Sequence, residues 1–298
     1  MSLESTHAGQ VIEQLEYVEE AAASFRIMPT NPTMLKVAEV AKVVHTIDFP
    51  QKEFRRMGSE DAYKYLNTRE DYQSTIDFGV NALTFLAYGI NARAGAGTND
   101  RSLAMAYSIE IDGVENFIQM LGSRIEAMRL HLDSESDELQ CSADIVSAQI
   151  TDPSTSDFIG LGSHHTPGTT APITGADPTT PFTWNAVEQD ILDFNLTVTR
   201  NISNKRPIGD PLIKFQRPTM RKIAGDFTVE WNTDASVSLE DDLRAQTLRT
   251  FVYNLNDTIA LTITNAKLFN ISGRDPDANA TESIAMKLGF NANSATIA

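Results

Sequence analysis

The sequence predicts a mainly β protein: an antiparallel β-sandwich or small barrel with one or two short packed helices, an N-terminal helix and a long Thr/Pro/Gly-rich loop insertion. From residue 103 onward, apolar and polar residues alternate with a period of two in one segment after another. The polar positions are mostly Ser, Thr, Asn, Asp and Glu, so one face of each sheet should meet water. With 298 residues the chain can bury the core of one large β domain or two smaller ones.

The N-terminal segment, residues 1–30, is predicted to be a helical arm in front of a β domain formed by residues 31–298. Within residues 9–25, four apolar residues recur three or four positions apart, which places them along one side of a helix. These residues are Val11, Leu15, Val18 and Ala22. Two prolines in residues 29–33 would end the helix. The arm could pack on its own domain or dock on a neighbouring subunit, and no residue distinguishes the two arrangements.

The alternating segments predict the strands in chain order. The first comprises residues 72–78, and a short helix capped by Asn81 should follow it. The later strands are recognised by their apolar positions. These are Tyr107, Ile109 and Ile111; Met128, Leu130 and Leu132; Leu139, Cys141, Ala143 and Ile145; Leu192, Phe194, Leu196 and Val198; Ile223, Phe227, Val229 and Trp231; Ile259, Leu261 and Ile263; and Ile284, Met286, Leu288 and Phe290.

A second helix is expected between two of the later strands. Ser238 suits its N-cap and Asp241 its third position, as in a capping box. Acidic residues 240–242 would then occupy the first turn, which the helix dipole favours, with Arg249 near the far end. The predicted apolar stripe comprises Leu239, Leu243, Leu248 and either Phe251 or Val252.

Residues 151–183 have a different composition, with nine Thr, five Pro, four Gly and three Ser among 33 residues. Such a composition predicts a loop, and long loops inside compact domains are commonly functional or mobile. We interpret the segment as an exposed insertion, because the strands on either side are alike and could pair. A linker between two domains is the alternative.

The formal net charge of −16 excludes several classes of protein. Binding to duplex DNA requires clustered cations that neutralise phosphates, and an anionic membrane surface requires the same. No apolar run is long enough to span a bilayer, and the first 20 residues contain five Glu and no Lys or Arg, unlike an export signal. One cysteine can form neither an internal disulfide nor a Cys-based metal cluster.

No motif indicates catalysis, a cofactor or a metal, so the chain is predicted not to be an enzyme. His164 and His165 adjoin one another in the Thr-rich loop, where adjacent side chains usually point apart rather than converge on a metal. The segment 275–282 has oxygen ligands spaced as in a calcium loop but lacks its glycine and its final glutamate. Cys141 falls on the apolar side of its strand and should be a buried thiol.

Several segments together resemble the tail tube proteins, or major tail proteins, of tailed bacterial and archaeal viruses. An alternating strand ends in Asn (residues 191–202), and a second strand is entered through a basic pair and a glycine (residues 218–230). The acidic helix follows, then two strands at residues 261–266 and 283–292. Residues 69–78 and 83–89 resemble the early strand and helix of the same family. The insertion and the N-terminal helix depart from its simplest members.

The resemblance implies a structural virion protein whose hexameric rings stack into a hollow tail tube that delivers viral DNA to the host cell. It implies contacts with further copies of the chain and with tape-measure, tail-terminator and baseplate or sheath proteins, but not with a membrane. The protein would be made and assembled in the host cytoplasm and would reside in the virion tail. DNA would pass without specific binding, and an acidic lumen would help by repelling it.

Two sets of polar strand residues are candidates for the lumen surface. They are Gln140, Ser142 and Asp144 in one strand, and Asp193, Asn195, Thr197 and Thr199 in another. The sequence does not determine which polar face points inward.

Two other functions compete with the tail tube. The first is an adhesion or carbohydrate-binding β-sandwich of a virion or cell surface, for which Trp184 beside the long loop is the candidate aromatic platform. The second is a hydrolase with an unrecognised pair of carboxylates.

Overall fold

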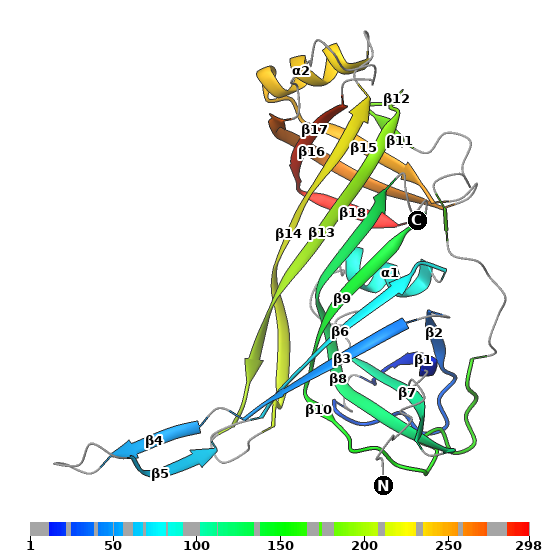
Figure 1. The fold of residues 1–298 in the computed structure, drawn as a ribbon, viewed down its shortest axis with the longest axis vertical. Coiled ribbons are helices and arrows are strands. Elements are labelled where there is room, and N and C mark those ends of the chain that lie inside the picture. The colour runs from blue at the N-terminus through cyan, green and yellow to red at the C-terminus, as the bar shows by residue number, and fades with distance from the viewer. Residues whose placement is uncertain are drawn as a thin grey trace, which may run out of the picture.

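A computed structural model shows an elongated β structure built around one main hydrophobic core (Figure 1). The structure describes residues 12–21, 25–38, 41–49, 51–55, 62–67, 70–81, 83–91, 102–111, 113–133, 138–165, 173–174, 182–207, 212–230, 235–255, 259–272 and 285–297. All pairings between its named strands are antiparallel. The predicted fold class, a mainly β antiparallel sandwich or small barrel with few helices, is thereby confirmed.

The first layer is a continuous sheet of eight strands, or parts of strands. Strands β8 and β16 contribute only their C-terminal portions to it. In spatial order the layer contains β3 (Ala41–Asp48), β6 (Asp71–Gly79), β9 (Gln140–Ser147), β8 (Val114–Asp133), β13 (Ile191–Lys205), β14 (Phe215–Glu230), β17 (Ala285–Ala292) and β16 (Ala260–Ser272).

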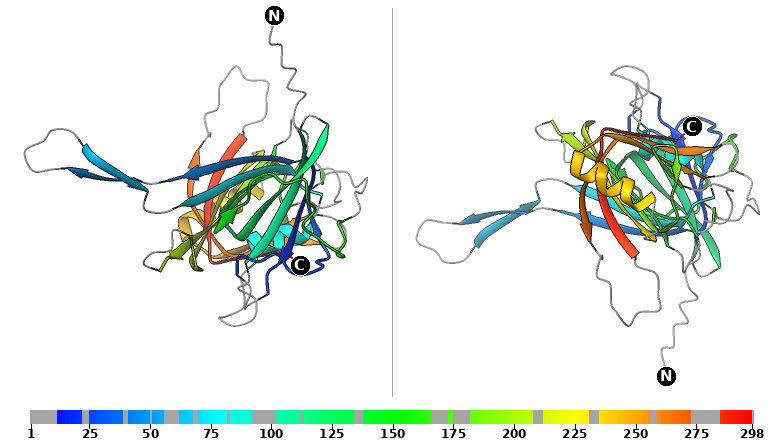
Figure 2. Two further views of the ribbon diagram at one scale, coloured as in Figure 1. Left: turned by 90° about the horizontal axis from the view of Figure 1, so that it is seen from below. Right: turned by 90° about the horizontal axis from the view of Figure 1, so that it is seen from above.

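The second layer covers the inner face of the first in two parts. One part adds β2 (Leu35–Ala38), β1 (Ile12–Glu19), β7 (Leu103–Ile111) and β10 (Gln149–Ile150) to the first half of β8. The other adds β12 (Val187–Glu188), β11 (Phe182–Trp184), β15 (Arg249–Asn254) and β18 (Ser294–Ile297) to the first half of β16. A separate ribbon of β4 (Gln51–Arg55) and β5 (Ala62–Asn67) extends away from the body (Figure 2).

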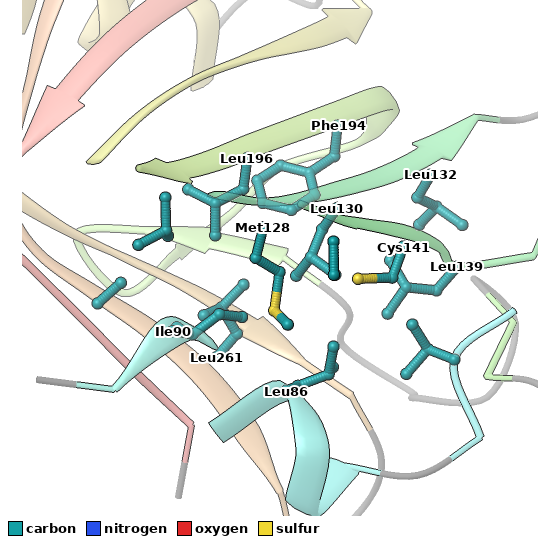
Figure 3. Packing of buried hydrophobic residues seen from close by; sticks show 14 of the residues in the cluster. Leu86, Ile90, Met128, Leu130, Leu132, Leu139, Cys141, Phe194, Leu196 and Leu261 are labelled. Atoms are coloured by element: carbon teal, nitrogen blue, oxygen red, sulfur yellow. The ribbon is translucent and has the colours of Figure 1, made fainter. Parts of the chain in front are cut away.

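The inward-facing residues of both layers meet in the core, with helix α1 (Leu83–Ile90) packed against β8 and β18. Figure 3 shows Leu86 and Ile90 of this helix beside Met128, Leu130 and Cys141. Gly89 permits the close approach, because a Cβ atom there would lie 2.5 Å from the Met128 side chain. The expected helix after Asn81 is confirmed, and Cys141 is buried as predicted.

Strand β8 passes from the second layer to the first at Gly122. This glycine has φ +62°, a conformation that disfavours residues with a Cβ atom. The buried Glu20 carboxylate accepts a 2.7 Å hydrogen bond from the Gly122 amide, and Ser123 donates to the Met120 carbonyl. A register shift follows between Ile125 and Ala127. The positive φ of Gly122 and this register shift allow β8 to pair with β7 in its N-terminal half and with β9 and β13 in its C-terminal half.

Helix α2 (Ala235–Ala245) covers the end of the molecule that is uppermost in Figure 1. Its Asp242 is buried, accepts a 2.9 Å hydrogen bond from the Trp184 indole and forms a bidentate ion pair with Arg249, with distances of 2.7–3.0 Å. Burial opposes ionisation, but the hydrogen bonds from Arg249 and Trp184 outweigh it and lower the pKa of Asp242. This contact fixes α2 on the sheet.

The predicted N-terminal helix is wrong, since residues 12–19 form strand β1 between β7 and β2. Leu15 and Tyr17, two positions apart, both enter the core, while Glu16 and Val18 face the other way. The helical spacing of apolar residues coexisted here with a period of two. Pairing with two neighbouring strands stabilises the extended form, which outweighs helical propensity. The expected division of the chain near residue 30 stays a prediction.

Two details of the second predicted helix are also wrong. It begins at Ala235, three residues before the expected cap Ser238, and it ends at Ala245. Leu239 is buried as expected, but Leu248 is exposed and Phe251 belongs to strand β15. Trp231, predicted on the apolar face of its strand, lies outside the described residues.

The strands on either side of the predicted loop insertion do not pair with each other. Strand β8 lies between β9 and β13 and pairs with both. The loop also ends earlier than predicted, because Phe182 already begins β11. The strands that adjoin the segment, β10 and β11, belong to the two different parts of the second layer. The insertion stays a prediction.

None of the helices in the described part of the chain has the length and apolar character that a membrane span requires.

Replacing Gly122 with Ala should lower the free energy of unfolding by about 3 kcal/mol, combining the cost of positive φ with overpacking. A Cβ atom there would lie 2.8 Å from Ala148 Cβ and 3.0 Å from the Phe25 ring. Gly113→Ala is the matched control, because Gly113 also has positive φ but its nearest atom would be 3.9 Å away. Chemical denaturation measures both variants. Equal losses would contradict a packing role for Gly122.

Candidate functional site

The two candidate sets of lumen residues lie on one face of the first layer. Strand β8 runs between the strands that carry them, and its residues are opposite both sets. Arg129 is paired with Ser142 on one side and Thr197 on the other, and His131 is paired with Gln140 and Asn195. Directly opposed residues point to the same face of an antiparallel sheet. The alternatives that the sequence left open are therefore parts of one surface.

This surface continues over all eight strands of the layer and is called the polar face below. One complete row of opposed residues crosses it from β3 to β16. That row is Lys42, Asp77, Ser142, Arg129, Thr197, Ala224, Asn291 and Lys267. Neighbouring rows add Val44, Thr75, Asp144, Thr199 and Lys222, then Gln140, His131, Asn195, Asp226 and Gly289, then Asp193, Thr228, Lys287 and Glu230.

Hydrogen bonds and ion pairs tie the polar side chains of neighbouring strands together. Arg129 forms a 2.6 Å ion pair with Asp144, and the Thr75 hydroxyl donates to the same carboxylate at 3.2 Å. The hydrogen bond to Asp144 raises the pKa of Arg129, so this pair stays charged. The half-exposed Arg129 side chain remains accessible to water, which limits what the pair contributes to stability.

A second network centres on Asn195. Its amide donates to Asp226 at 3.0 Å and to Asp193 at 3.3 Å, while its carbonyl oxygen lies 2.6 Å from His131 Nδ1. Since an amide oxygen only accepts, His131 Nδ1 must be the donor. Lys287 forms a 2.7 Å ion pair with Asp226, and that hydrogen bond raises the pKa of Lys287.

The polar face carries a modest acidic excess. Its described cations are Lys42, Arg129, Lys222, Lys267 and Lys287, and its described carboxylates are Asp48, Asp71, Asp77, Asp144, Asp193, Asp226 and Glu230, with Glu126 close to Asp144 at the bulge of β8. Most of the acidic excess of the chain therefore lies elsewhere. A surface on which several charges are paired presents a weaker negative potential to a passing polyanion than the strongly repelling lumen expected from net charge.

The structure adds residues that sequence reasoning did not select. Thr75 and Asp77 from β6, Arg129 and His131 from β8, and Asp226 from β14 share the polar face with the selected residues. Their strands show the same alternation, so the signal was present. What the sequence lacked was the strand order, which decides that these polar positions adjoin one another.

The other candidate sites lose their functional interpretation. Trp184 is 1% exposed and donates to Asp242, so it offers no aromatic platform. The predicted calcium-like segment 275–282 lies outside the described residues. His164 and His165 do not point apart, because both imidazoles contact Glu16. Within the part of the chain that the structure describes, no group of three or more His, Cys, Asp or Glu side chains could hold a metal ion.

Comparison with known protein families identifies the family of the chain. The model of the family described as phage tail tube protein matches residues 59–292. The chain belongs to the phage tail tube protein family. The match covers most of the chain and includes all seven candidate residues on β9 and β13. No curated protein matches the chain.

Membership assigns this tail tube protein a structural role in the virion tail and supports its assembly into a tube with other tail components. The family is structural and implies a non-enzymatic protein, in agreement with the prediction. The polar side chains that are linked across strands agree with a structural role.

Asp144→Asn should lower the free energy of unfolding of the tail tube protein by less than about 1 kcal/mol, because its ion pair with Arg129 is partly exposed. Asp242→Asn is the buried comparison and should cost more, since it removes the charge paired with Arg249 beneath α2. Urea denaturation near neutral pH measures both. A larger loss for Asp144→Asn would show that the polar face is structurally required.

Proposed function

We propose that six copies of the chain form a ring, that rings stack into the hollow tail tube, and that the polar face lines the channel through which viral DNA reaches the host cell. The observation that carries this proposal is the polar face itself. It extends over eight neighbouring strands, has the core on its other side, and contains all seven candidate residues.

The two edges of the first layer support ring formation. Among the described strands, β3 pairs only with β6, and residues 267–272 of β16 pair only with β17. Unpaired edges of this kind are templates for pairing with another chain. Val44 and Phe269 are 46% and 55% exposed at the opposite edges, and the Phe269 ring packs over Gly289 of the polar face. Burial between adjacent subunits would remove both from water.

The charge of the polar face, on which carboxylates outnumber cations, supports passage of DNA without retention. A surface with an excess of cations would bind phosphates and release counterions, which slows movement. Arg129 and Lys287 are paired with Asp144 and Asp226, so these cations are already partnered within the subunit. The proposed channel therefore offers DNA phosphates few unpartnered cations and a modest negative charge.

The remaining assignments follow from this arrangement. The proposed partners are further copies of the chain, the tape-measure and tail-terminator proteins, and baseplate or sheath proteins at the ends and outside of the tube. Assembly is proposed to take place in the host cytoplasm. The adhesion alternative has no specific observation in its favour, since its one candidate platform, Trp184, is buried.

Ring and tube formation can be tested by negative-stain electron microscopy of the purified chain over a range of concentration and salt. We expect six-fold rings or hollow tubes. Rings of a different symmetry would contradict the hexamer. Tail tubes isolated from virions, imaged in the same way, provide the symmetry if the purified chain requires an initiator.

Reversing charge on the polar face should slow genome ejection. The double variant Asp144→Lys, Asp193→Lys adds cations to the proposed channel wall, and their attraction to DNA phosphates should reduce the ejection rate at low salt several-fold. The control Glu188→Lys, Asp241→Lys makes the same change in net charge at exposed positions on β12 and α2. Unchanged ejection in assembled tails of the first variant, or equal slowing in both, would contradict the lumen assignment.

A further inference from the structure

The outer face of the second layer buries a carboxylate beneath a loop. Glu16 of β1 points away from the core and is only 2% exposed, because residues 151–165 fold over it. We call residues 151–165 the strap. Its Ser154 exchanges backbone hydrogen bonds with Phe117, and its Ser163 accepts from Met34 and donates to Pro32. The strap thus joins β8 to the segment between β1 and β2.

Three donors from the strap converge on Glu16. The backbone amide and Nδ1 of His165 lie 2.7 and 2.8 Å from Glu16 Oε1, and Nδ1 of His164 lies 2.7 Å from Oε2. A buried carboxylate is costly unless it is paired and hydrogen-bonded. These contacts connect two regions about 150 positions apart in the sequence.

His164 contacts a carboxylate with each of its ring nitrogens. Nδ1 lies 2.7 Å from Glu16, and Nε2 lies 3.3 Å from Asp157 within the strap. A neutral imidazole has one donor and one acceptor, so it satisfies only one of these carboxylates, whereas an imidazolium donates to both. The ring also stacks on Phe117 at 6.2 Å with an interplanar angle of 11°, and Phe158 meets it edge-on.

We propose that the strap is held by a proton-dependent clasp in which protonated His164 bridges Glu16 and Asp157. Protonation completes the clasp, and deprotonation leaves Nε2 without a proton to donate to Asp157. The clasp itself does not depend on the proposed function. Only its position on the outside of the tube, opposite the polar face, follows from that proposal.

The charged groups around His164 favour its protonated form. Asp157 of the strap and Glu16 of β1 contact the ring directly, and Lys36 of β2 lies opposite Glu16 in the register. Glu110 and Glu115 are paired at the ends of β7 and β8, near Phe117, on which the ring stacks, and His165 is the other titratable group on Glu16. Burial lowers the pKa of His164, but the hydrogen bonds and charges of Glu16 and Asp157 outweigh it and raise that pKa. Lys36 is paired with Glu16 in the strand register and is the one cation in this set.

The direction of the pH dependence follows from the raised pKa. The folded state binds the proton more tightly than the unfolded state, so the contribution to stability is complete below the ordinary histidine pKa and is lost as pH rises through the folded value. Ile159 of the strap packs on Met34 and Ala106, and Val18 and Met28 border them. Loosening the strap therefore exposes an apolar patch on the outer surface at higher pH.

Amide hydrogen exchange on the full-length chain tests the clasp. The reporters are the amides of Leu161, Ser163 and His165, which donate to Asn31, Pro32 and Glu16. After correction for intrinsic exchange, their protection should fall about fivefold between pH 5.5 and pH 8, the difference between a charge-assisted and a neutral hydrogen bond. Unchanged protection over this range would overturn the proposal.

His164→Gln separates charge from hydrogen bonding, because glutamine retains a donor for Glu16 but cannot carry a proton charge. In this variant the protection of the three reporter amides should be independent of pH and equal to their protection in the wild type at pH 8. His131→Gln, on the polar face, should retain the wild-type pH dependence, and so should His165→Gln if His164 alone is responsible. If His164→Gln fails to fold, the protonation state of His164 can be measured in the wild type from the nitrogen chemical shifts of its imidazole. We expect an imidazolium at pH 6, and a neutral ring at that pH would overturn the clasp.

Discussion

The arrangement of the two layers depends on the bend in β8 at Gly122. A single strand that pairs with β7 and β10 in one half and with β9 and β13 in the other must change direction without losing its hydrogen bonds. Positive φ at Gly122 and the following register shift achieve the turn, and Glu20 accepts the hydrogen bond of the Gly122 amide. Without this bend, the first layer could not continue from β9 to β13, and its polar face would be divided.

The polar face shows how an acidic chain can present a surface on which several cations and carboxylates are paired. Its charged side chains come from strands far apart in the sequence, and the antiparallel register sets cations beside carboxylates. Arg129 meets Asp144 across the β8–β9 pairing, and Lys287 meets Asp226 across the β14–β17 pairing. Each pair contributes little to stability because it is accessible to water. The opposite charges of each pair largely cancel each other's electrostatic potential, which matters for a surface proposed to face a polyanion.

Buried carboxylates join distant segments elsewhere in the molecule. Glu20 accepts from Ser102 and from the amides of Gly122 and Arg26, and burial raises its pKa despite those bonds. Glu16 accepts three donors from the strap, and Asp242 holds α2 through Trp184 and Arg249. The donors outweigh the cost of burial at Asp242, whose pKa is lowered, but offset it only in part at Glu20. Part of the acidic character of the chain is thus internal and structural.

Local patterns in the sequence determined the fold class, the positions of eight of the eighteen described strands and the short helix α1. Alternation with a period of two predicted the buried side of β6, β9 and β13, because each strand has one face on the core and one in water. Pattern reasoning failed at β1, where residues 12–19 fit a helical and an extended period at once. Only contact with β7 and β2 favours the extended form.

The polar face, too, could be predicted only in part from the sequence. Alternation placed the candidate residues of β9 and β13 on the polar sides of their strands, but it could not show that β8 lies between these strands and unites them. Neither could the sequence show that His164 and His165 converge on Glu16, or that Trp184 is buried. Strand order, register and long-range contacts are decided by how the whole chain packs its apolar surface. The sequence by itself determined which side of each strand is polar, and the tertiary structure decided which polar residues meet.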